Sequence, residues 1–283
     1  MIDLHMHSNC SDGTDSLEEL YEKVKAAGIT VFALTDHDTV AGDDAMKKLA
    51  EKEGRIRFLP GIEVSCLIDA VDVDSDCHIV GLNIDYTSKG ILDIVEANVR
   101  YRHEKLGEIL EYLKDSFGIE FPEEVVSRLS EIPNVGKGHI KVELFKAGYG
   151  DDPSDAYSKY LMDFKSAKHV LAKDAIAAIK AAGGLAVWAH PIGDEPEIER
   201  HKTREEFRPQ LDALLRLGLD GIEVCYSRYT TAEEQLILDE IKGTGLLVSA
   251  GSDYHGRNKN VELGQFGIET PLIEAVNIDT AFD

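Results

Sequence analysis

Positive charge is scarce in this chain of 283 residues, in which 30 lysine and arginine residues stand against 53 aspartate and glutamate residues. The formal net charge of −23 would repel the phosphates of nucleic acids and of acidic membranes. An anionic substrate therefore needs local positive charge at its binding site, and bound divalent cations would provide it. We expect a small substrate, and neither a nucleic-acid polymer nor a membrane as a partner.

Cysteines and long apolar runs are also few. The chain has four cysteines without Cys-x-x-Cys spacing, and at this length it needs no disulfide framework. No apolar run reaches about 18 residues, and no basic segment followed by an apolar one opens the chain. We therefore expect a cytoplasmic protein with free thiols, without a signal peptide or a membrane span.

Histidines and carboxylates are present in a suggestive arrangement at the start of the chain. Residues 2–7 are expected to form a strand, and alternate side chains of a strand share a face, so His5 and His7 can bind one metal. Asp12 follows in a Ser-Asp-Gly-Thr turn that can fold it back over the strand end. Two imidazoles and a carboxylate suit zinc, manganese or iron.

Strand and helix patterns alternate over most of the chain, which predicts a parallel α/β sheet with right-handed crossovers. Strands are expected at 2–7, 29–34, 56–64, 185–189, 221–225 and 246–250, and helices at 16–27, 41–52, 173–182, 207–217 and 231–244. Residues 86–169 contain helical patterns only, at 91–117, 122–130, 138–147 and 154–163. We expect a barrel domain, 1–85 and 170–283, with an inserted helical lid domain, 86–169.

One connection is too short for a crossover helix. About ten residues separate Cys66 from the strand that begins at His78, which predicts a hairpin or near-hairpin and places His78 next to Glu63. The aspartates in this connection lack the glycine and distal glutamate of a calcium loop, so we expect a solvated acidic loop; they are Asp69, Asp72, Asp74 and Asp76.

Candidate metal ligands follow the expected strands at their carboxyl ends, where the chemistry of a (β/α) barrel is found. These nine residues are His5, His7, Asp12, His37, Glu63, His78, His190, Asp253 and His255. Nine ligands are too many for one or two ions with open positions, but three ions that share Glu63 would use them. Closely spaced ions hold a phosphoryl oxygen and activate water, which predicts phosphoester hydrolysis.

The segments that carry these residues resemble the metal-binding motifs of the PHP (polymerase and histidinol phosphatase) family, in the same order. They are His5-Met6-His7 with Asp12, Thr35-Asp36-His37-Asp38-Thr39, Pro60-Gly61-Ile62-Glu63, His78-Ile79-Val80-Gly81, Ala189-His190-Pro191 and Gly251-Ser252-Asp253-Tyr254-His255-Gly256. The resemblance implies a distorted, seven-stranded (β/α) TIM-like barrel with three divalent ions, manganese, iron or zinc. Within the family, the helical insertion resembles small bacterial phosphoesterases acting on nucleotide and sugar phosphates.

The resemblance also implies how the ligands are divided. The first ion would be bound by His5, His7, Glu63 and Asp253, the second by Glu63, His78 and His190, and the third by Asp12, His37 and His255. The attacking group would be a hydroxide that bridges metal ions. All of these residues except His78 are expected to take part in catalysis as well as in metal binding.

Four further residues are candidates for binding the substrate. Lys137 and His139 begin an inserted helix and could hold a phosphate oxygen there, while Arg228 and Arg257 follow strands at the catalytic end. The resembling proteins often have Gly-Arg-Pro-His where this chain has Gly136-Lys137-Gly138-His139, and an arginine after His-Pro where this chain has Ile192-Gly193. The residues expected to face the substrate phosphate therefore differ from those of the resembling proteins.

The leading prediction is a phosphoesterase that cleaves a nucleotide phosphate, a nucleoside bisphosphate, or a sugar mono- or cyclic phosphate. Histidinol phosphate is the alternative substrate within the family. The acidic charge disfavours a single-strand exonuclease. A non-catalytic metal-binding module should have lost ligands, and this chain keeps all nine. A related hydrolase of C–N bonds commonly uses a carbamylated lysine at a strand end, for which no candidate stands out.

Overall fold

The computed structural model describes residues 1–70, 73–166, 168–193 and 201–282. It divides into two compact units. The barrel unit contains the described residues of 1–95, 170–193 and 201–282, and the helical unit contains those of 96–169. No described helix is long and apolar enough to cross a membrane.

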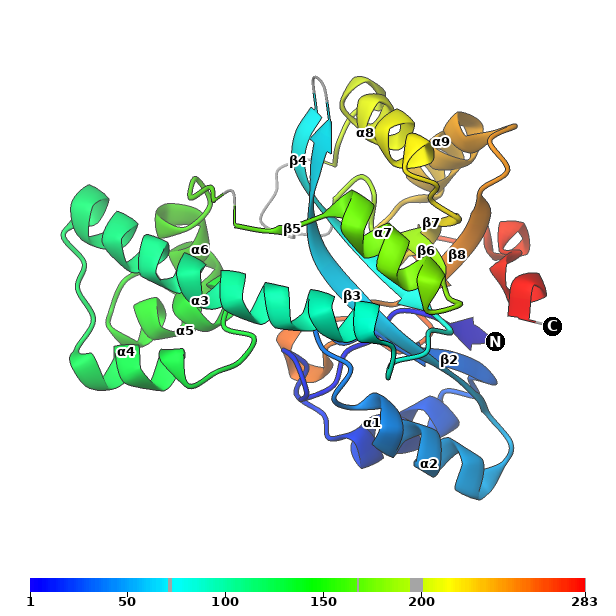
Figure 1. Cartoon of the computed structure of the whole chain (residues 1–283), viewed down its shortest axis with the longest axis horizontal. Coiled ribbons are helices and arrows are strands. Elements are labelled where there is room, and N and C mark those ends of the chain that lie inside the picture. Colours follow the sequence, from blue (N-terminus) through cyan, green and yellow to red (C-terminus); the bar gives the residue numbers. More distant parts are fainter. Residues whose placement is uncertain (71–72, 167, 194–200, 283) are drawn as a thin grey trace. The chain divides into compact units, whose positions relative to one another are not determined.

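Seven strands of the barrel unit form one sheet in the order β1-β2-β3-β4-β6-β7-β8 (Figure 1). They are β1 Ile2–Asp3, β2 Val31–Leu34, β3 Arg57–Ala70, β4 Val73–Leu82, β6 Leu185–Trp188, β7 Gly221–Tyr226 and β8 Leu247–Gly251. Neighbours are parallel, except that β4 is antiparallel to both β3 and β6. A short strand, β5 Val170–Leu171, pairs with β3 outside this order.

The sheet closes on itself between its first and last strands. The Leu4 amide donates to the Ala250 carbonyl at 3.1 Å, and the His7 amide donates to the Tyr254 carbonyl at 2.8 Å. This seam makes the sheet a nearly closed, distorted barrel, which confirms the predicted fold. The seam also carries metal-ligand candidates from both ends of the chain, since His5, His7 and Asp253 all lie on it.

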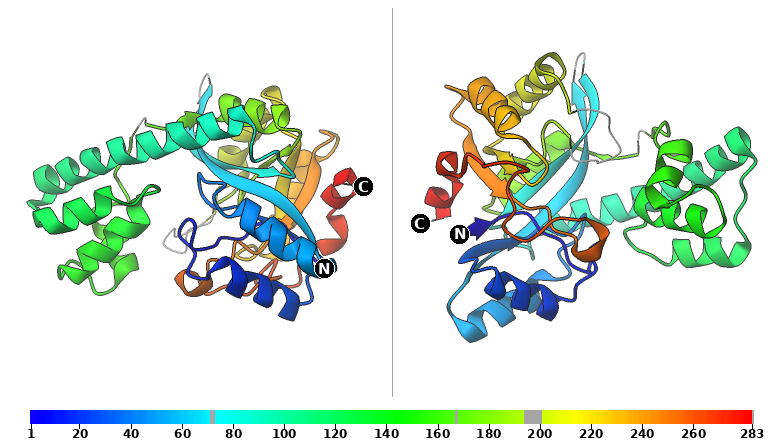
Figure 2. Two further views of the ribbon diagram at one scale, coloured as in Figure 1. Left: turned by 60° about the horizontal axis from the view of Figure 1, so that its bottom comes forward. Right: turned by 180° about the vertical axis from the view of Figure 1, so that it is seen from behind.

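Helices cover the outside of the barrel sheet (Figures 1 and 2). They are α1 Leu17–Ala26, α2 Asp43–Glu53, α7 Ala172–Ala181, α8 Arg204–Arg216 and α9 Thr231–Ile241. Three begin with a capping box, in which a serine or threonine and a glutamate three residues later exchange hydrogen bonds with the backbone. Each buries one apolar face. The ring of Phe207 on α8, for example, stacks on that of the buried Trp188 on β6, with the ring centroids 5.2 Å apart.

The helical unit has a hydrophobic core of its own. Its helices are α3 Lys89–Phe117, which starts in the barrel unit, α4 Glu123–Ser130, α5 Lys137–Lys146 and α6 Pro153–Tyr160. Buried side chains from all four helices pack together, among them Leu113, Leu129, Leu144 and Ala156. These four helices agree within a few residues with those expected from the sequence.

The structure corrects the expected connection after residue 64. β3 runs on to Ala70 and β4 begins at Val73, so most of the expected acidic loop is a β-hairpin. Asp69 and Asp76 lie in its strands, and Asp72 lies outside the described residues. The hairpin itself was expected, and it places His78 opposite Ser65, two residues beyond Glu63. The expected first strand was too long, because only Ile2 and Asp3 pair with β2.

Candidate metal centre

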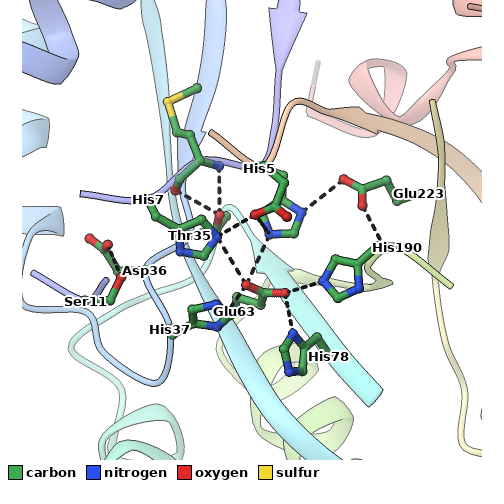
Figure 3. Close-up of polar contacts among 12 residues, drawn as sticks. His5, His7, Ser11, Thr35, Asp36, His37, Glu63, His78, His190 and Glu223 are labelled. Atoms are coloured by element: carbon green, nitrogen blue, oxygen red, sulfur yellow. Dashed lines mark hydrogen bonds and ion pairs between the residues drawn. The ribbon is translucent and has the colours of Figure 1, made fainter. Parts of the chain in front are cut away.

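Glu63 lies at the middle of the centre with its side chain fully buried on β3 (Figure 3). Its Oε2 atom lies 3.2 Å from His5 Nε2, 3.2 Å from His7 Nε2 and 3.0 Å from His37 Nδ1. The first two histidines come from the barrel seam, and His37 follows β2. Three imidazoles from two segments therefore converge on one carboxylate oxygen.

The other oxygen of Glu63 faces a second pair of histidines. Glu63 Oε1 lies 2.9 Å from His78 Nδ1 and 2.9 Å from His190 Nε2. His78 comes from β4 and His190 follows β6. The antiparallel β4 is what brings His78 to this end of the barrel, since the parallel strands present only their carboxyl ends there.

Two aspartates complete the cluster on the side of the seam. Asp253 Oδ1 lies 3.2 Å from His7 Nε2 and 3.3 Å from His255 Nδ1. Asp12 Oδ1 lies 3.2 Å from His255 Nε2, and Asp12 Oδ2 lies 3.9 Å from His37 Nε2. The structure thus gathers all nine candidate residues at one end of the barrel.

The nine residues form four overlapping groups, and within each group the ligand atoms all lie within 4.8 Å of one another. They are His7, Asp12, His37 and His255; His5, His7 and Asp253; His5, Glu63 and His190; and His37, Glu63 and His78. The group of His7, Asp12, His37 and His255 resembles the set expected to bind the third ion. The group of His5, His7 and Asp253 resembles the set expected to bind the first ion. The residues expected to bind the second ion fall into two groups, because Glu63 is grouped with His190 and His5 in one and with His78 and His37 in the other.

Buried polar atoms in the cluster test whether metal ions fit. His5 Nε2, both ring nitrogens of His7 and Glu63 Oε2 are buried without a hydrogen-bond partner among the described residues. A buried polar atom without a partner costs about 1–3 kcal/mol. Ring nitrogens and carboxylate oxygens that face one another fit a divalent cation between them, since both are electron-pair donors. The donor set therefore fits metal binding.

The electrostatics keep the carboxylates ionised. Burial opposes ionisation, but the charges of His37, His5 and His78 hold the pKa of Glu63 well below its usual range. Burial is likewise outweighed at Asp253, where Lys259 and His255 hold the pKa of the carboxyl well below its usual range. Both groups are therefore anionic at neutral pH and available as ligands.

Backbone strain marks two of the candidate ligand positions. His190 has a φ angle of 30° and Asp253 one of 55°, both in the left-handed region that residues other than glycine rarely adopt. Gly251 ends β8 just before Asp253, and a Cβ atom there would lie 2.2 Å from His5 Cβ and 2.5 Å from Glu223 Oε1. Such strain persists only where surrounding contacts enforce it, and it is concentrated at functional sites.

Glu223 on β7 is a member of the site that sequence reasoning missed. Its carboxylate is buried, with Oε1 3.1 Å from His5 Nδ1, and Oε2 accepts a hydrogen bond from the His190 amide at 2.8 Å. A carboxylate on the far ring nitrogen of a ligand histidine fixes its orientation and tautomer. The available signal was a glutamate at the third residue of an otherwise apolar strand.

Asp36 supports the turn that presents Asp12. Asp36 accepts hydrogen bonds from the Ser8 amide at 2.8 Å, the Ser8 hydroxyl at 2.6 Å and the Ser11 hydroxyl at 2.6 Å. These bonds hold the segment after His7 against the end of β2 (Figure 3). The Ser-Asp-Gly-Thr turn therefore folds back as expected from its composition.

The four candidate substrate residues are divided between the units. Lys137 and His139 lie in the helical unit, where Lys137 Nζ donates to the Phe164 carbonyl at 3.1 Å and His139 Nδ1 accepts from the Gly136 amide at 3.3 Å. Arg228 follows β7 with its Nε atom buried, and Arg257 is exposed in the turn after His255. Their contact with a substrate stays a prediction.

Fold and site together define a class, a hydrolase with a metal-binding cluster at the carboxyl ends of the strands of a distorted (β/α) barrel. Residues 3–215 match the family model of the PHP domain. The chain belongs to the PHP domain family, as its motifs predicted, and this is a family of hydrolytic phosphoesterases.

Similar proteins cover nearly the whole chain. A 5′-3′ exoribonuclease of Haemophilus influenzae is 32% identical over 268 residues, 93% of each chain. A phosphoribosyl 1,2-cyclic phosphate 1,2-diphosphodiesterase of Eggerthella lenta is 30% identical over 266 residues, 90% of this chain and 94% of that protein. A solved structure from Chromobacterium violaceum, described as an amidohydrolase with bound sulfate and no metal, has a TM-score of 0.78 at 28% identity and covers 92% of this chain and 89% of that one.

Proposed function

We propose that the centre binds three divalent ions, manganese, iron or zinc, and hydrolyses the phosphate ester of a small metabolite. The substrate would be a nucleotide phosphate, a nucleoside bisphosphate, or a sugar mono- or cyclic phosphate. The observation that carries the proposal is the position of Glu63, whose two oxygens lie within 3.2 Å of five imidazoles from four segments of the barrel unit. One carboxylate in that position can be shared between neighbouring ions.

The residues of the chain have separate tasks in this proposal. The ions would be held by the four overlapping ligand groups, and when bound they would activate water and stabilise charge on the phosphoryl oxygens. Asp12, His37 and His78 are partly exposed, with 43%, 17% and 28% of their side-chain surface accessible, so a substrate would approach from their side. Glu223 orients His5 and the His190 backbone.

Release of inorganic phosphate tests the proposal. The protein, stripped with a chelator and then reloaded with manganese, iron or zinc, is assayed on a panel of nucleotide, nucleoside bisphosphate, sugar phosphate, cyclic phosphate and histidinol phosphate substrates. We expect activity that is lost on stripping and restored by metal, with bound metal approaching three ions per chain. Full activity in the stripped protein without added metal would overturn the proposal.

A second candidate function is 5′-3′ exoribonuclease activity. The relative from Haemophilus influenzae carries that name and aligns over 93% of this chain, which weakens the expectation, drawn from the net charge of −23, that nucleic-acid polymers are not partners. Short 5′-labelled RNA oligonucleotides distinguish the two functions. Stepwise loss of 5′ nucleotides at rates above those on mononucleotides would favour the exonuclease.

A further inference from the structure

Lys259 contacts the metal centre directly, although no metal-binding motif includes it. Its Nζ atom forms an ion pair with Asp253 Oδ2. The same oxygen accepts a hydrogen bond from the Tyr226 hydroxyl at 2.9 Å. The other oxygen of Asp253, Oδ1, is the one that faces His7 and His255. Asp253 thus presents one oxygen to the ligand cluster and the other to a lysine and a tyrosine.

Lys259 lies at the partly exposed edge of the centre. It follows the short turn Gly256–Asn258, in which the Asn258 side chain donates to the Asp12 carbonyl at 2.6 Å. The side chain of Asp12 is 43% exposed and that of Lys259 is 19% exposed, whereas Tyr226 is fully buried. The two donors to Asp253 therefore differ in access, and of the two only Lys259 is open to solvent.

We propose that Lys259 is a substrate-binding residue, whose ammonium group, held beside the metal centre by Asp253, binds a phosphate oxygen of the substrate. The inference rests on the proposed phosphoesterase function. An ammonium carries three N–H donors, so it can contact Asp253 and a phosphate oxygen together. Outside residues 96–169 the chain has 19 lysine and arginine residues against 39 acidic ones, so a cation at this edge matters for an anionic substrate.

The test measures binding of inorganic phosphate by calorimetry to the manganese-loaded protein at saturating metal, with metal content determined for each variant. For Lys259→Met we expect the Kd for phosphate to rise by about tenfold, because one charge-assisted hydrogen bond is lost. The KM for a phosphate ester should rise by a similar factor, with a smaller change in kcat. Lys259→Arg keeps the charge and should stay within about threefold of the unmodified protein.

Two further variants separate this role from its rivals. Tyr226→Phe removes the other donor to Asp253 but leaves the ammonium in place, so the Kd for phosphate should not change at saturating metal. Lys242→Met changes the net charge equally, at an exposed position that precedes β8 at the opposite end of the barrel, and should also leave the Kd unchanged.

An unchanged Kd in Lys259→Met would overturn the proposal. Equal weakening in Lys259→Met and Tyr226→Phe would overturn it too, because Lys259 would then act only by positioning Asp253. If the unmodified protein binds phosphate through Lys259 but hydrolyses no ester, the binding role stands and the proposed function fails. The two failures are therefore distinguishable.

Discussion

The barrel unit and the helical insertion differ in both charge and construction. Residues 96–169 carry 11 lysine and arginine residues against 14 acidic ones, while the rest of the chain carries 19 against 39. The insertion builds its core from one continuous segment. The metal centre instead combines residues from both ends of the chain, since Asp253 lies within 3.6 Å of His5 and His7.

This difference in charge can be related to the candidate metal centre. Acidic residues are about equally frequent in both parts, but lysine and arginine are fewer outside 96–169, so the net negative charge is concentrated in the unit that gathers the candidate metal ligands, where bound cations would offset it. The helical unit is nearly balanced in charge, and its core is formed by buried side chains from Leu106 to Phe164, within one continuous segment. The two units should therefore respond differently to loss of a ligand, loss of metal and change of pH.

The largest effect is expected for Glu63→Gln. An amide cannot bridge two cations as a carboxylate does, so activity should fall by more than about 10³-fold, which is several kcal/mol of lost transition-state stabilisation. Phosphate release and metal content per chain check this. Glu120→Gln makes the same chemical change at an exposed position of the helical unit and should leave both unchanged. Full metal content and activity in Glu63→Gln would contradict the central role of this residue.

Removal of metal should destabilise the barrel unit alone. A metal ion that binds only the folded protein, at about 1,000 times its Kd, stabilises the folded state by about 4 kcal/mol. For a unit of about 200 residues this corresponds to a rise in Tm of about 10 °C. Calorimetry with and without manganese should show one transition that shifts and one, from the helical unit, that does not. An equal shift of both transitions would show that the units unfold together.

Glu223→Gln should have a smaller effect, because Glu223 acts through His5 and the His190 backbone. Loss of a carboxylate that orients a ligand histidine typically costs about 10–100-fold in metal affinity or activity. Titration of the stripped protein with manganese measures the affinity. Glu205→Gln, at an exposed position in the first turn of α8, is the matched control. An unchanged affinity in Glu223→Gln would limit this residue to a structural role.

The smallest effect concerns pH and a carboxyl group of the barrel unit outside the ligand cluster. Burial raises the pKa of Glu234 on α9 from 4.5 to about 7, and its Oε2 atom accepts from the Leu272 amide at 2.6 Å. The folded state keeps this proton between those pH values and the unfolded state loses it, so stability falls as pH rises from about 4.5 to about 7.

Glu234→Gln should remove this pH dependence, because the amide stays neutral and can still accept the Leu272 hydrogen bond. We expect a Tm about 2–4 °C higher than that of the unmodified protein at pH 8, and little difference at pH 4.5. Thermal unfolding at the two pH values measures both. An equal change at pH 4.5 and pH 8 would contradict a role for ionisation of Glu234.

Much of the site could be predicted from residue type and position alone. His5 and His7 are two residues apart in an expected strand, and Glu63, His190 and Asp253 follow or lie in others. Even the unusual placement of His78 followed from a connection too short for a helix. The contacts of Glu223, Tyr226 and Lys259 could not be predicted in this way, because no spacing encodes a contact between segments far apart in the chain.

The amino-acid sequence by itself determined that strands alternate with helices, that a helical block interrupts them, and that histidines and carboxylates suited to binding metal stand at the strand ends. These are local properties, set by periodicity, capping and residue chemistry. Only the tertiary structure decided the barrel seam between Leu4 and Ala250, and with it the division of ligands around Glu63 and the contact of Lys259 with Asp253. The physical reason is that closure of a sheet joins residues some 250 positions apart through backbone hydrogen bonds that any side chains would permit.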